Sequence, residues 1–69
     1  MTFTFYGTLG SGRPGYPGYM RVIVEADQRG EAEMAARKRM REATNNRWCF
    51  LYDSLEAMHP LDRIHRGDA

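Results

Sequence analysis

Few side chains in this sequence belong to the types that perform nucleophilic chemistry. Cys49 is the single cysteine, and His59 and His65 are the two histidines. A catalytic cysteine needs a lowered thiol pKa beside a positively charged partner. Cys49 instead stands between Trp48 and Phe50, in a run typical of a strand, where cysteine behaves as a small buried hydrophobic residue. We therefore expect no catalytic residue.

A metal site is the next candidate. His59, Asp62 and His65 follow an H-x2-D-x2-H pattern just before and after Pro60. Structural zinc usually needs a full tetrahedral set of good ligands, and no further ligand stands nearby. We expect no metal and no cofactor, and we expect Asp62 to pair with a neighbouring arginine, Arg63 or Arg66.

Residues 10–15 match the G-x-G-x-x-G pattern of dinucleotide-binding loops. Such a site needs the turn to open a helix whose amides hold the pyrophosphate. Pro14 and Pro17 follow here, and then a strand, so residues 10–18 are predicted to be a loop. The loop has two readings: a flexible connection, or a protein-binding surface that presents Tyr16 and Tyr19.

Length and composition restrict the class of protein. The 69 residues allow one domain, residues 1–69. Such a domain has a small core, about 3–5 kcal/mol of stability, and little chain to wall a deep catalytic cavity. We therefore expect a non-enzymatic protein. The net charge of +1 fits neither a strongly basic nucleic-acid-binding domain nor an acidic mimic of DNA.

The compartment is predicted from the cysteine count and the apolar runs. One cysteine cannot form an internal disulfide, which favours a reducing cytoplasm. The first residues lack the basic and apolar regions of a signal peptide. No apolar run approaches the ~20 residues of a membrane span. A cytoplasmic protein without a membrane partner is the expectation.

Hydrophobic periodicity predicts three strands and one helix. Residues 2–9 and 19–26 alternate between apolar and polar positions, and residues 47–52 do so with aromatic side chains. A helix is predicted over residues 28–44, with Asp27 as its N-cap and Asn45 and Asn46 as its stop. Residues 55–59 form either a fourth short strand or an irregular edge. Residues 61–69 are expected to dock through Leu61 and Ile64 and then to fray.

These elements predict an α+β fold. A three-stranded or four-stranded antiparallel sheet carries one helix on one face, in the order β-β-α-β. The buried stripe of the helix is predicted to contain small residues that let it lie close to the sheet, namely Ala32, Ala36, Met40 and Ala43. The expected core comprises Phe5, Val22, Val24, Ala36, Met40, Trp48 and Phe50.

The outer helix face and the loop supply the candidate binding residues. Basic residues late in the helix complement the helix dipole, which explains them without any partner. An exposed methionine among them is also typical of an interface. Alternating aromatics at Trp48, Phe50 and Tyr52 are either core residues or a base-stacking surface. The predicted partner-binding residues are Tyr16, Tyr19, Met34, Arg37, Lys38 and Arg41.

In size, in strand and helix order, and in the helix pattern from Asp27 to Asn46, the chain resembles small bacteriophage proteins that disarm their hosts. These include transcription inhibitors and anti-CRISPR proteins. The resemblance implies a protein–protein interaction in the host cytoplasm that inhibits a bacterial nucleic-acid-handling complex, a defence nuclease or RNA polymerase, by steric occlusion. Two alternatives stay open: nucleic-acid binding through the basic helix and aromatics, and a homodimer through an edge strand.

Overall fold

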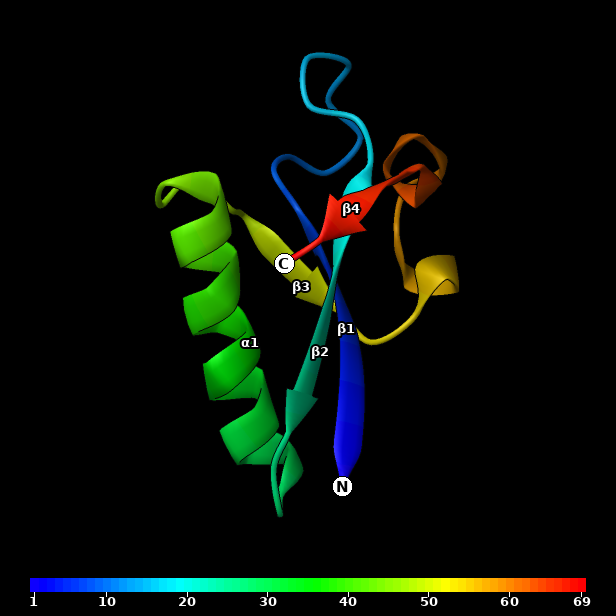
Figure 1. Ribbon diagram of the computed structural model, residues 1–69. Coiled ribbons are helices and arrows are strands. Elements are labelled where there is room, and N and C mark those ends of the chain that lie inside the picture. The colour runs from blue at the N-terminus through cyan, green and yellow to red at the C-terminus, as the bar shows by residue number, and fades with distance from the viewer.

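A computed structural model covers residues 1–69 and shows one helix packed on a four-stranded mixed sheet (Figure 1). This confirms the predicted α+β class. The sheet order is β3-β1-β2-β4. In chain order, the elements are β1 (Thr2–Thr8), β2 (Tyr19–Glu25), α1 (Arg29–Thr44), β3 (Phe50–Tyr52), the short 3₁₀ turns η1 (Leu55–Ala57) and η2 (Pro60–Arg63), and β4 (His65–Asp68).

Strands β1 and β2 form the antiparallel hairpin that their alternation predicts. Their register runs from Thr2 opposite Glu25 to Gly7 opposite Met20. Directly opposed residues share a face of the sheet. One face therefore carries the apolar residues that contact α1, and Phe5 is 2% exposed there. The helix-side core comprises Phe5, Val22, Val24, Ala32, Ala36 and Met40.

The depth at which α1 packs is set by Met40 and Gly7. A Cβ atom at Gly7 would lie 2.5 Å from Met40 Cε, so only glycine leaves room for this side chain. The buried stripe ends at Thr44, whereas Ala43, predicted to be buried, is exposed. The Thr44 hydroxyl donates to the Met40 carbonyl and accepts from the Trp48 amide, which satisfies it inside the protein.

The two ends of α1 were predicted with different success. The residue that precedes the first turn is Gln28, in an extended conformation and without a side-chain capping bond, so Asp27 is not the N-cap. At the other end, Asn45 and Asn46 have φ angles of 57° and 64°. Asparagine tolerates this left-handed region better than most residues, and the predicted stop is confirmed.

The chain after the helix differs from the prediction in its strands. β3 starts at Phe50 rather than at residue 47, and residues 55–57 form η1 rather than a strand. The last strand is β4, which runs parallel to β2, so the tail does not fray. Leu61 and Ile64 are exposed. The tail docks through backbone hydrogen bonds, which a hydrophobic pattern cannot reveal.

The aromatic residues 48–52 do not share one environment. Trp48 is half-buried against the helix-side core, and the Arg37 guanidinium lies 6.0 Å from its ring centre. Phe50 is 47% exposed, on the opposite face of the sheet with Tyr52, and its predicted burial is wrong. The prediction placed Trp48 and Phe50 on one face because it extended the strand back to residue 47. Trp48 in fact precedes β3, so the alternation of faces along the strand does not include it. Cys49, also predicted to be buried, is exposed.

The loop of residues 10–18 is held by the C-terminal segment, in what we call the loop clamp. The Gly12 amide donates to Asp62 Oδ2 at 2.8 Å, and Asp62 is completely buried. Gly12 has a φ of 68°, and a Cβ there would lie 2.8 Å from the His59 ring. Asp62 forms no ion pair with Arg63 or another arginine, contrary to prediction, because its carboxylate points to the loop.

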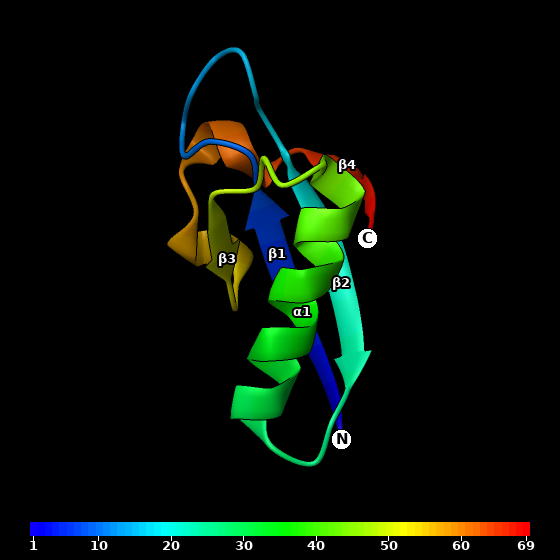
Figure 2. The ribbon, with the colours of Figure 1, turned by 90° about the vertical axis from the view of Figure 1, so that its left-hand side faces the viewer.

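Further hydrogen bonds of the loop clamp hold the start of β2. The Gly18 amide donates to the Leu61 carbonyl, and the Tyr19 amide donates to the Ile64 carbonyl. The loop and η2 consequently lie close together, and η1 and η2 lie across the sheet from α1 (Figures 1 and 2). Tertiary hydrogen bonds therefore hold this loop at Gly12 and at Gly18.

Both sheet edges are partly protected. β3 pairs only with the stretch of β1 from Tyr6 to Thr8, which leaves Thr2 to Phe5 unpaired on that side. At the other edge, Arg39 donates to the Ile23 carbonyl at 2.6 Å, beyond the end of the β4 pairing. A homodimer through an edge strand stays a prediction, and the unpaired half of β1 is where such pairing would occur.

No helix in the structure has the length and apolar character that crossing a membrane requires.

The two phenylalanines on opposite faces should respond differently to truncation. Phe5→Ala removes a core side chain and should lower the free energy of unfolding by about 3–5 kcal/mol. Phe50→Ala, at an exposed position, should cost about 0.5 kcal/mol. Urea unfolding followed by tryptophan fluorescence measures both, and equal midpoints for the two variants would contradict the assignment of faces.

The loop clamp makes a prediction about Asp62. Asp62→Ala leaves the Gly12 amide without an acceptor and should cost about 1–3 kcal/mol. Asp62→Asn keeps an oxygen acceptor for the Gly12 amide, so this variant should lose less stability than the alanine variant. Thermal unfolding gives the stabilities, and amide exchange at Gly12 should be faster only in the alanine variant.

Candidate functional site

The ionised side chains are unevenly distributed along the molecule. Carboxylates are frequent where β2 ends and α1 begins. Arginines are frequent where α1 ends, beside Glu42, and one lies in the loop of residues 10–18. These two regions lie at opposite ends of the molecule (Figure 1). We call this second region the basic end. It comprises Arg13 and Tyr16 of the loop, Arg41 in the last turn of α1, Arg47 beyond that helix, and Arg66 of β4.

None of the four arginines at the basic end forms an ion pair. Arg47 donates from Nε to the Thr44 carbonyl at 3.4 Å, and Arg66 donates from Nη1 to the Pro17 carbonyl at 3.3 Å. Each guanidinium carries several further N–H donors and a full positive charge. The basic end therefore offers uncompensated positive charge to an anionic partner.

Two surface cavities hollow the basic end and share Leu9 and Arg47. The first, of about 220 Å³, lies between the end of α1, the strand ends that flank the loop, and Arg66. The second, of about 200 Å³, is lined by Leu9, Arg13, Tyr16, Arg47 and Cys49. Each cavity thus combines guanidinium groups with apolar surface, the mixture found at the buried anchors of protein interfaces.

The structure brings only part of the predicted site to this end. Tyr16 is 44% exposed and lines the second cavity, and Arg41 stands exposed in the last turn of α1. Tyr19 is among the residues that line the first cavity, but its ring lies on the sheet face away from α1. There it packs edge-on against Tyr6, with ring centres 5.3 Å apart, and beside the ring of His65.

The other predicted residues lie along the helix. Met34 is 73% exposed and Lys38 is exposed on the outer side of α1, two turns and one turn before Arg41, respectively. Arg37 lies at the flank of the helix, over the ring of Trp48. The helix face and the loop therefore meet only through the last turn of α1.

Sequence analysis missed Arg13, Arg47, Arg66 and Leu9 as parts of one site. Three of them stand where the chain changes direction, in the loop or just beyond α1, and no periodicity marks them. Arg66 lies near the chain end, and only the parallel pairing of β4 with β2 carries it to the loop. The signal that was available is the absence of acidic residues between positions 43 and 52 and within the loop.

The residues considered for catalysis and metal binding are placed apart from one another. Cys49 donates its thiol proton to the Leu9 carbonyl, with Sγ and O 2.8 Å apart. His65 contacts Asp68, whereas Asp62 contacts the loop, and no group of three potential metal ligands comes together. The loop of residues 10–18 leads into β2 and opens no helix.

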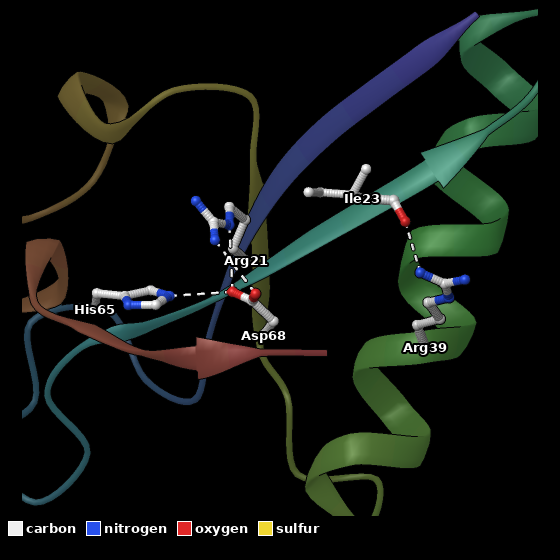
Figure 3. A network of polar contacts seen from close by, with 5 residues as sticks. All are labelled: Arg21, Ile23, Arg39, His65 and Asp68. Atoms are coloured by element: carbon white, nitrogen blue, oxygen red, sulfur yellow. Dashed lines mark hydrogen bonds and ion pairs between the residues drawn. The ribbon is translucent and has the colours of Figure 1, made fainter.

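Asp68 lies at the centre of a polar network that docks β4 (Figure 3). Its oxygens accept from Arg21 Nε and Nη2, each at 3.2 Å, and Oδ1 lies 3.1 Å from His65 Nε2. The hydrogen bond from Arg21, and next that from His65, lowers the pKa of Asp68 below its ordinary 3.8. The same pair raises the pKa of Arg21. This network holds the strand that carries Arg66.

The lowered pKa predicts an acid-sensitive β4. Because the folded protein favours ionised Asp68, its contribution is complete above the ordinary pKa and is lost as the pH falls below 3.8. Amide NMR shifts of residues 65–69 should therefore change below pH 3.8. Asp68→Asn should show the same shifts already at neutral pH, while Glu56→Gln should leave them unchanged. Unaltered shifts in Asp68→Asn would contradict the role of the network.

Comparison with known protein families, characterised proteins and solved structures returned no match, so the fold and the basic end are the findings on which a function can be based.

Proposed function

We propose that this protein is a non-enzymatic module that binds a partner protein through its basic end and inhibits that partner by steric occlusion. The supporting observation is that Arg13 and Arg47 line one cavity with Tyr16, and that none of the four arginines at this end forms an ion pair. Tyrosine and arginine are the residue types that most often dominate binding energy at protein interfaces. The surface that the partner presents should be acidic, because it must compensate these guanidinium charges.

The distribution of charge favours a protein over a nucleic acid. A polyanion extends beyond any single contact and calls for a basic stripe. Here the net charge is only +1, and carboxylates at Glu25, Asp27, Glu31 and Glu33 occupy the opposite end. A discrete acidic patch on a protein can meet the basic end alone.

Nucleic-acid binding is the second candidate, because of the exposed sheet face. The rings of Phe50 and Tyr52 lie 6.2 Å apart on that face, and such rings can stack on unpaired bases. The arginine of the same row, Arg21, already pairs with Asp68. Arg63, on the same side of the sheet, forms no ion pair but donates to three backbone carbonyls. This face therefore offers fewer free guanidinium donors to a phosphate backbone than the basic end does.

The identity of the partner stays a prediction from the resemblance to bacteriophage proteins. That resemblance points to a bacterial complex that handles nucleic acid, a defence nuclease or RNA polymerase, in the host cytoplasm.

Capture from a bacterial lysate, with and without nuclease, tests the proposed function. Tyr16→Ala and Arg41→Glu should each weaken capture by about 2 kcal/mol or more, as for interface anchors. Each should change stability by only about 0.5 kcal/mol, because both side chains are exposed. Lys38→Glu should weaken capture less, since Lys38 lies outside the basic end, and Glu31→Gln at the other end of α1 is the control.

Three results would contradict this proposal. One is a partner that disappears after nuclease treatment. Another is affinity that falls steeply with salt in proportion to the phosphates contacted. The third is undiminished capture by both Tyr16→Ala and Arg41→Glu, which would direct attention to the sheet face of Phe50 and Tyr52.

A further inference from the structure

The larger cavity of the basic end has the composition of an anion-binding site. Its polar lining includes the side chains of Arg47 and Arg66, and none of its lining residues is acidic. Gly7 and Gly18 contribute only backbone to its lining, while Leu9 and Met20 give it an apolar part. The hydroxyl of Thr44, which also lines the cavity, already donates to the Met40 carbonyl and accepts from the Trp48 amide.

Both guanidinium groups are anchored to backbone carbonyls and retain free donors. Arg47 uses Nε toward Thr44, which leaves both of its terminal nitrogens available, and Arg66 uses Nη1 toward Pro17. The two arginines come from different elements, one from beyond α1 and one from β4. Neither meets a carboxylate of this chain, so two positive charges line one small space.

Close packing holds the stem of Arg66 in place. A Cβ atom at Gly18 would lie 2.5 Å from Arg66 Cγ and 2.7 Å from the Ile64 carbonyl oxygen. Gly18 also has a φ of 97°, which disfavours any other residue. The contact with Gly18 and the hydrogen bond to the Pro17 carbonyl therefore favour one position of the Arg66 stem, which reduces the entropy that binding must overcome.

We propose that this cavity binds a phosphoryl group carried by a phosphorylated side chain of the partner protein. This inference rests on the proposed function. Two uncompensated guanidinium groups match a phosphate monoester, which carries close to two negative charges at neutral pH. A carboxylate carries one charge and would leave the second guanidinium uncompensated. The apolar part, Leu9 and Met20, would contact the body of the phosphorylated side chain.

Titration of the whole protein with phenyl phosphate tests this assignment directly. The arginine Nε–Hε NMR signals of Arg47 and Arg66 should shift, and phenyl phosphate should bind about tenfold more tightly than phenylacetate, a difference of about 1.4 kcal/mol. Arg47→Gln and Arg66→Gln should each weaken phenyl phosphate binding about tenfold. Arg37→Gln, which removes an exposed arginine outside the cavity, should leave it unchanged. Dispersed amide spectra confirm that each variant is folded.

Several outcomes would overturn the assignment. Equal binding of phenylacetate excludes selectivity for a phosphoryl group. Equal shifts at Arg37 and Arg41 indicate general attraction of anions rather than a site. Tighter binding of a 5′-phosphorylated trinucleotide through the same arginines identifies nucleic acid as the source of the phosphate.

The failure of this inference and the failure of the proposed function give different results. If the cavity is not a phosphoryl site but the basic end binds the partner, phenyl phosphate leaves the signals of Arg47 and Arg66 unshifted, while Tyr16→Ala and Arg41→Glu still weaken partner capture. If the basic end does not bind a protein, no substitution there affects capture, although phenyl phosphate can still shift the signals of Arg47 and Arg66.

Discussion

The arrangement of the loop and the C-terminal segment depends on one hydrogen bond, which the Gly12 amide donates to the buried carboxylate of Asp62. It links the loop after β1 to the segment before β4, 50 residues later. A buried carboxylate is costly unless it is hydrogen-bonded, and Asp62 Oδ1 has no partner in the protein. Asp62 must therefore lie where the Gly12 amide can reach it. This requirement, with the other bonds of the loop clamp, restricts the positions of the loop, η2 and β4.

The two faces of the sheet are stabilised in different ways. On the side of α1, small and flexible side chains allow a close approach, with Met40 seated on Gly7. On the other side, η1 and η2 are joined by backbone bonds and by Arg63, which donates to the carbonyls of Leu55, Met58 and Glu56. The side of α1 is a hydrophobic core, whereas the opposite side depends on directional polar contacts.

This division explains why the basic end is available for binding. The arginines that form ion pairs within the chain are Arg21 and Arg29, and their partners are Asp68, Glu33 and Asp53. The arginines beside the loop bind only backbone carbonyls or no protein acceptor. Their positive charges are therefore not neutralised by carboxylates in the folded protein. A module of this size cannot enclose a substrate, but it can present a preorganised charged surface to a larger partner.

The sequence by itself determined the elements that local physics controls. Alternation in residues 2–9 and 19–26 specified the hairpin and its core-facing residues Phe5, Val22 and Val24, because one face of a strand pair must be apolar. The spacing of Ala32, Ala36 and Met40 specified the buried face of α1. The paired asparagines specified its end, since asparagine tolerates a left-handed backbone.

Only the tertiary structure decided how the chain beyond the helix is used. β4 has no hydrophobic pattern, because it docks through backbone bonds and the pair of Arg21 with Asp68. The exposure of Phe50 depended on where pairing with β1 begins. Arg13, Arg47 and Arg66 form one site because the loop clamp and a parallel strand bring distant residues together. Contacts of this kind join positions with no common period, so a linear sequence contains no local signal for them.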